Sequence, residues 1–138
     1  PDYLVAALAN SILGRFGLAG KRDDNARDLA QGERKLLDVA LAYALKPKLL
    51  FLDEPTSGVC TRNKAQIMDT IAQVVRGQGI TAVIVEHDIN VIWSLCDEVL
   101  FMAEGSVVLR GAPHEIPANR PMVQWVKKAK KELAKKKN

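Results

Sequence analysis

The 138-residue sequence has few cysteines, few aromatic residues and no long apolar run. Its two cysteines, Cys60 and Cys96, have no paired spacing, so we expect reduced cytosolic thiols rather than a disulfide. Nowhere do about 18 apolar residues follow one another, which is the length that a membrane-spanning helix requires. With 48% hydrophobic and 26% charged residues, the composition is that of a globular protein with one core.

Positive charge is concentrated at one end of the chain. The net charge is +4, but the last twelve residues hold seven lysines and one glutamate and carry +6, so the remaining 126 residues carry −2. The body of the chain is therefore not an obvious nucleic-acid binder, and no nucleic acid is expected as a partner. The basic end, residues 117–138, is predicted to contain a helix. This helix is either solvated and packed onto the body of the chain through Trp125 or Met122, or it lies on anionic lipid. Its apolar stripe consists of Met122, Val126, Ala129 and Leu133.

Hydrophobic periodicity predicts an α/β fold with parallel strands and flanking helices. Apolar residues recur at helical spacing in four segments, and two short apolar runs are typical of strands buried on both faces of a parallel sheet. An antiparallel hairpin follows them. The predicted helices are residues 4–16, 32–45, 63–75 and 89–95, the strands are residues 49–52 and 80–85, and the hairpin lies within residues 98–111.

Ionisable side chains stand where both predicted parallel strands end. Asp53 and Glu54 follow the first strand, and His87 follows the second. Because the carboxyl ends of strands border the ligand crevice in open α/β sheets, we expect these side chains near a ligand. One carboxylate can hold Mg²⁺ through its retained waters while the next activates a water. The alternative is a solvated strand end whose charges have no chemical role.

Four short motifs in a fixed order give the sequence a family resemblance. "LAQGE" (29–33) opens a helix, "LLFLDEP" (49–55) ends a strand, and "SGVC" (57–60) and "VEHD" (85–88) follow. This series resembles the second half of an ATP-binding-cassette (ABC) ATPase, with its signature loop, Walker B strand, D-loop and switch histidine. The resemblance covers roughly residues 12–116. It implies a partial P-loop NTPase fold and ATP with Mg²⁺ as cofactors.

The resemblance also implies a role for each matching residue. Asp53 would hold the Mg²⁺ water, Glu54 would be the general base, and His87 would reach the γ-phosphate, as suits phosphoryl transfer. The signature helix would offer its N–H groups and positive end to ATP held by a second ATPase subunit, so this site exists only in a dimer. The residues implied in that contact are Leu29, Ala30, Gln31, Gly32, Glu33, Ser57 and Gly58.

The phosphate-binding P-loop of the family is missing. The nearest stretch, "RFGLAGKR" (15–22), has Arg15 and Arg22 where the motif needs glycine and serine or threonine, and it follows a helix rather than a strand. We therefore predict that it connects two helices and that the first half of the cassette is absent. The chain also opens on Pro1, which suggests that its beginning has been removed. This chain alone is expected not to hydrolyse ATP, whereas its complete parent should.

Two positions depart from the family pattern. Ala30 stands at the signature serine and removes a hydroxyl, and Cys60 stands at the D-loop aspartate and removes a polar contact between subunits. Both changes weaken the case for normal turnover without removing the residues assigned to chemistry. A reactive Cys60 thiol is the other interpretation of that position, but no base stands near it in the sequence.

The sequence looks most like the ATPases that energise uptake of branched-chain amino acids, amides or urea. The implied partners are transmembrane permease subunits, which would place the protein in the cytoplasm on the inner face of the membrane. Expected divisions are a helical signature subdomain (1–46), the ATPase core (47–116) and a basic tail (117–138). Alternatives are a shortened, non-hydrolysing cassette that docks on a permease, and a DNA-repair or chromosome-structuring ATPase, whose long heptad repeats do not occur here.

Overall fold

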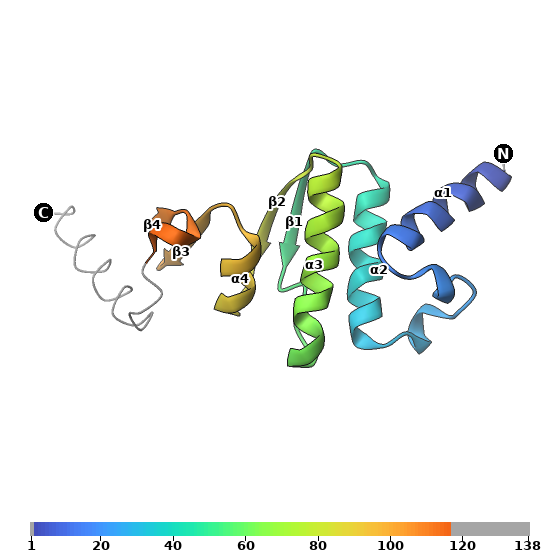
Figure 1. Ribbon diagram of the computed structural model, residues 1–138, viewed down its shortest axis with the longest axis horizontal. Coiled ribbons are helices and arrows are strands. Elements are labelled where there is room, and N and C mark those ends of the chain that lie inside the picture. Colours follow the sequence, from blue (N-terminus) through green and yellow to red (C-terminus); the bar gives the residue numbers. More distant parts are fainter. Residues whose placement is uncertain (1, 117–138) are drawn as a thin grey trace, which may run out of the picture. The chain divides into compact units, whose positions relative to one another are not determined.

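The computed structural model describes residues 2–116, which fall into two compact units, one ending at Val91 and the other beginning at Ile92. Figure 1 shows the main elements, coloured along the chain from the N-terminus in blue. They are α1 (Asp2–Arg15), two 3₁₀ turns (Ala19–Lys21 and Ala26–Asp28), α2 (Gln31–Ala44), β1 (Leu49–Asp53), α3 (Thr61–Gly77), β2 (Thr81–Val85), α4 (Ile89–Leu95), β3 (Val99–Ala103), β4 (Ser106–Gly111) and a 3₁₀ turn (Pro113–Glu115). The predicted terminal helix and its apolar stripe lie outside the described residues.

A parallel pair of strands organises the first unit. β1 and β2 pair in register from Leu49 opposite Thr81 to Asp53 opposite Val85. In Figure 1, α2 and α3 run side by side next to these strands, and α2 contacts β1 while α3 contacts β2. Both strands therefore point the same way, and the residues that follow Asp53 and Val85 emerge at one end of the sheet. The predicted α/β architecture with parallel strands is confirmed.

The helices form where the apolar residues recur at helical spacing. α3 buries one continuous face against its neighbours, made of Ile67, Met68, Ile71, Val74 and Val75. It ends as predicted at a glycine, because Gly79 adopts a left-handed φ of 63° that only glycine reaches without strain. Tyr43 of α2 packs edge-on against Phe16 with ring centroids 5.6 Å apart, and Phe16 and Leu18 are almost fully buried. These buried contacts hold the connector between α1 and α2 against α2.

The apolar runs of both parallel strands are typical of strands buried on two faces, but in this chain only one face of the pair is buried. Burial alternates along β1, where Leu50 and Leu52 are buried and Phe51 is 70% exposed. Along β2 the side chains of Val83 and Val85 are likewise exposed. α2 contacts β1 and α3 contacts β2, whereas within residues 2–116 the side chains on the other face of the pair are exposed. An apolar sheet face therefore meets solvent.

The second unit contains the predicted antiparallel hairpin. β3 and β4 are joined through Glu104 and Gly105, whose φ angles of 50° and 75° fit a tight two-residue turn. A bulge interrupts the pairing between Phe101 and Met102. Across the open end, the Arg110 guanidinium donates to both carboxylate oxygens of Glu98 at 2.6 and 3.1 Å. None of the helices in residues 2–116 has the length and apolar character of a membrane-spanning segment.

Candidate functional site

The candidate acid–base residues gather at the carboxyl end of the parallel strands. Asp53 is the last residue of β1, and its side chain faces solvent. Glu54 follows it with a left-handed φ of 45°, an uncommon conformation for a residue with a side chain. The Glu54 N–H donates to the Val85 carbonyl oxygen at 2.8 Å, which extends the β1–β2 ladder by one residue. Strained backbone of this kind is typical of functional sites, where the surrounding structure holds it.

His87 stands opposite Glu54, one residue beyond Glu86 on the neighbouring strand end. Its Nδ1 lies 3.6 Å from Oε1 of Glu54 and 3.9 Å from Oε2 of Glu86. The side chains of His87 and Glu54 are 68% and 50% exposed, so both can reach a ligand. The structure thus brings together residues 33 positions apart that the sequence analysis had assigned to one site.

A buried contact beneath these two residues was missed by the sequence analysis. The side chain of Glu86 is 0% exposed, and so is Thr56. Oε1 of Glu86 accepts from the Thr56 N–H at 3.1 Å and from the Thr56 hydroxyl, while Oε2 accepts from the His87 N–H at 3.2 Å. The available signal was an acidic residue directly before the histidine in "VEHD", because an acid at a buried strand end requires donors.

The signature stretch opens α2 as predicted. Leu29 is buried, and Ala30 occupies the N-cap position, where its methyl group cannot accept a hydrogen bond. The Glu33 carboxylate accepts from the Ala30 N–H at 2.8 Å, so one side of a capping box is present. The first turn beyond Ala30 therefore lacks a side-chain acceptor from the N-cap.

Two glycines allow this helix end to approach its neighbours closely. A Cβ added at Gly32 would lie 2.7 Å from Cδ1 of Ile67 in α3. A Cβ added at Gly58 would lie 2.6 Å from Nε2 of Gln31, and Gly58 has a left-handed φ of 76°. The Ser57 N–H donates to the Glu54 carbonyl oxygen at 3.0 Å, so one turn runs from the candidate base to Ser57, directly before Gly58. The two groups of predicted residues are linked through this turn.

The P-loop-like stretch forms the predicted connector between α1 and α2. It ends α1, turns at Gly17 and enters the first 3₁₀ turn. Lys21 lies 3.4 Å from the Asp24 carboxylate and 3.7 Å from that of Glu33. Lys21 is therefore paired with carboxylates, unlike a lysine that awaits phosphates at the end of a strand.

The described residues fit part of a Mg²⁺–ATP site. An exposed carboxylate at Asp53 suits a magnesium ion that keeps most of its waters, and no group of three or more metal-ligating side chains occurs among the described residues. The N–H groups that open α2 suit an anion. No described glycine-rich loop joins a strand to a helix to cradle phosphates, so the fit covers the catalytic and signature sides of the site only.

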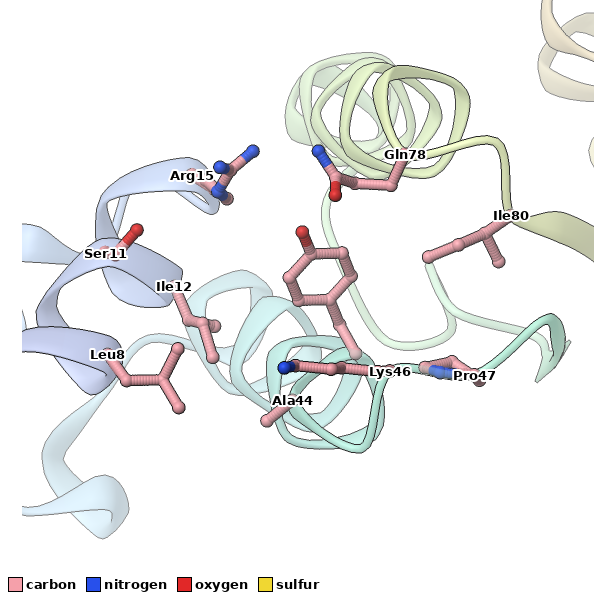
Figure 2. Close-up of a pocket in the computed structure, with 10 residues that line it drawn as sticks. Leu8, Ser11, Ile12, Arg15, Ala44, Lys46, Pro47, Gln78 and Ile80 are labelled. Atoms are coloured by element: carbon pink, nitrogen blue, oxygen red, sulfur yellow. The ribbon is translucent and has the colours of Figure 1, made fainter. Parts of the chain in front are cut away.

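A cleft of about 310 Å³ lies elsewhere in the first unit. Figure 2 shows its walls, with Leu8, Ile12 and Arg15 of α1 on one side and Ile80 on the other. Pro47 and Ile80 precede β1 and β2, so the cleft is at the amino ends of the strands. It is therefore separate from the strand-end carboxylates, and none of the predicted site residues lines it.

Comparison with known proteins finds solved structures with a similar fold. Residues 5–57 match the family described as ABC transporter. The solved structure of cbiO1 from Clostridium perfringens, described as part of the ABC transporter complex cbiONQ, has a TM-score of 0.80 and 32% identity and covers 91% of this chain. The fold is that of an ABC transporter ATP-binding domain. A nucleotide-free cassette from an ABC transporter is also similar, with a TM-score of 0.75 and 25% identity over 85% of this chain.

Curated ABC relatives are similar over most of this chain but extend well beyond it. The energy-coupling factor transporter ATP-binding protein EcfA3 of Clostridium perfringens is 32% identical over 126 residues, which are 91% of this chain and 44% of the relative. The methionine import ATP-binding protein of Carboxydothermus hydrogenoformans is 35% identical over 119 residues, 86% of this chain and 35% of the relative. The chain thus spans half or less of the length of these proteins.

Proposed function

We propose that this chain is the carboxyl-terminal portion of the ATP-hydrolysing subunit of an ABC importer. The observation that carries the proposal is the meeting of Glu54 and His87, whose side chains come within 3.6 Å at the ends of adjacent parallel strands. Both side chains are at least half exposed, and Asp53 directly precedes Glu54 in the chain. In phosphoryl transfer most of the catalysis comes from positioning and charge neutralisation. This cluster could position a water, and the Asp53 carboxylate could hold the Mg²⁺ that neutralises phosphate charge.

Each residue has a separate task in this proposal. Asp53 holds the water shell of Mg²⁺, which neutralises phosphate charge when bound. Glu54 accepts the proton of the attacking water, or orients that water, and His87 contacts the γ-phosphate. The opening of α2, from Leu29 to Glu33, with Ser57 and Gly58, faces the ATP of a second ATPase subunit. The complete site therefore requires a dimer.

The partners and substrate extend the same proposal. The protein would act on transmembrane permease subunits at the cytoplasmic face of the membrane, and no nucleic acid is expected. The substrate we propose is a branched-chain amino acid or related amide, on the likeness of the sequence alone. Similar proteins are named for methionine, spermidine or putrescine, and arginine, which supports import of small polar solutes without narrowing the choice.

The test compares the complete protein with two site variants. The complete wild-type protein should hydrolyse Mg–ATP, and Glu54→Gln should lower kcat by about a hundredfold or more, as loss of a general base does. His87→Ala should also lower kcat severely with little change in ATP affinity, because its contact is made to the group being transferred. Asp69→Asn, an acid-to-amide change at an exposed position of α3, is the matched control. Near-normal turnover in both site variants would refute the proposal.

The chain by itself should neither hydrolyse ATP nor bind it tightly, since no P-loop is present to hold the phosphates. Calorimetric titration with Mg–ATP checks this, and a micromolar dissociation constant would contradict it. A second candidate, a non-hydrolysing module that docks on a permease, is favoured by the exposed apolar sheet face at Phe51 and Val85. An in-frame P-loop upstream in the encoding gene would favour the ATP-hydrolysing subunit over the non-hydrolysing module.

A further inference from the structure

The buried Glu86 carboxylate joins two loops that carry the proposed catalytic side chains. One loop leaves β1 and contains Glu54 and Thr56, and the other leaves β2 and contains His87. Glu86 gives one oxygen to each loop, with Oε1 accepting from Thr56 and Oε2 accepting from the His87 N–H. The bonds to Thr56 span 30 residues, so they are tertiary contacts and not part of local turn formation.

This contact is costly for a group that serves only the fold. Both the Glu86 side chain and Thr56 are 0% exposed, and a carboxylate removed from water loses its hydration. An apolar pair of the same shape would fill the space without that cost. No lysine or arginine is paired with Glu86 among the described residues, and Nδ1 of His87 lies 3.9 Å from its Oε2.

We propose that Glu86 is a positioning residue, which holds the Glu54 carboxylate and the His87 imidazole at a fixed separation. The inference rests on the proposed function, because the separation matters only if both groups act on one ligand. Thr56 stands two residues after Glu54, and Glu54 keeps a left-handed backbone that needs support on both sides. Its N–H is held by the Val85 carbonyl, and the turn that follows it is held by Glu86.

Three isosteric or near-isosteric variants separate positioning from stability. Glu86→Gln keeps the shape, but one acceptor oxygen becomes an NH₂ group. We expect the remaining oxygen to face the two donors of Thr56, so the NH₂ group faces the His87 N–H. Thr56→Val removes only the hydroxyl donor, and Thr56→Ser restores it. Thr70→Val is the control, since it removes a hydroxyl bonded at 2.9 Å to the Gln66 carbonyl within α3.

The first measurement uses this chain and needs no nucleotide. Amide hydrogen exchange followed residue by residue should show faster exchange of the His87 N–H in Glu86→Gln, by about tenfold for one lost hydrogen bond. Exchange of the Thr56 N–H should change less in that variant, and Thr70→Val should leave both amides unchanged. Unchanged exchange at His87 in Glu86→Gln would show that the two loops are not joined in this way and would overturn the inference.

The second measurement uses the complete protein. Glu86→Gln should lower kcat about ten- to hundredfold with KM for ATP within about twofold, because misplacing reacting groups acts on the chemical step. Thr56→Val should lower kcat less, and Thr56→Ser should recover it. A loss of activity that only follows the folded fraction, or normal kcat in Glu86→Gln, would refute positioning. If the wild-type protein itself shows no ATPase activity, the proposed function fails, and with it the inference.

Discussion

Replacing Gly32 by alanine tests why a glycine opens the signature helix. A Cβ at this position would lie 2.7 Å from Cδ1 of Ile67, whereas Cγ1 of Ile67 is 3.7 Å away and Cγ1 of Val59 is 3.9 Å away. Ile67 is only 5% exposed, so its terminal methyl group cannot move aside freely. Overpacking of this kind costs about 1–3 kcal/mol, and alanine returns about 0.5–1 kcal/mol through its helix propensity. We therefore expect Gly32→Ala to destabilise the chain by about 1–2 kcal/mol.

Ile67→Val provides the matched partner, because it deletes the one atom that the new Cβ would strike. Alone it should cost about 0.5–1.5 kcal/mol, the usual effect of Ile→Val in a core. In the double variant the nearest remaining atoms are at ordinary contact distance, so the two costs should not add. Urea unfolding of the four proteins should give a favourable coupling energy of about 1 kcal/mol or more. Simple additivity, or a Gly32→Ala chain as stable as the wild type, would refute the close packing of α2 on α3.

Three further predictions concern the chain itself. Cys60 is the N-cap of α3 and makes no side-chain cap, so Cys60→Asp should stabilise the chain by about 1 kcal/mol in urea unfolding; an unchanged midpoint would contradict this. The hydrogen bonds and charge of Arg110 hold the pKa of Glu98 below its ordinary value. This pair therefore stabilises the folded hairpin above about pH 4.5, and the stabilisation is lost as the pH falls. When the free energy of unfolding is measured against pH, Glu98→Gln should remove this loss of stability at acidic pH. The exposed sheet face should cause self-association, which Phe51→Lys should reduce in light scattering while Leu45→Lys, at an exposed helix end, should not.

Element types could be predicted from the sequence because hydrophobic spacing records which side of each element is covered. The α4 helix was predicted at residues 89–95 and is found there, and the glycine after α3 ended it as expected. The start of α3 was placed two residues late, because Cys60 is a weak N-cap signal and the first turn, beginning at Thr61, is polar. Boundaries depend on capping contacts that residue type alone does not determine.

Burial of the strands could not be predicted in the same way. A run of apolar residues such as that of β1 indicates that both faces of the strand are normally packed against other elements. It does not show whether the packing element belongs to the described part of this chain. Here Phe51 remains exposed while Leu52 beside it is buried. Likewise, the strand-end positions of Asp53, Glu54 and His87 followed from the pattern, whereas the pairing of Glu86 with Thr56 depends on two loops meeting 30 residues apart.

Glu54 and Glu86, the acids that follow two adjacent strands, have different surroundings, and this difference indicates how the site is built. Glu54 is half exposed and strained at φ 45°, so its carboxylate is available to a ligand while its backbone is costly to hold. The Glu86 side chain is fully buried and its carboxylate accepts three hydrogen bonds, so it is unavailable to a ligand and well placed to hold backbone. A reactive group on a flexible loop would lose conformational entropy each time a ligand bound and fixed its orientation. Supporting the exposed acid with a buried one lets the fold supply that orientation in advance.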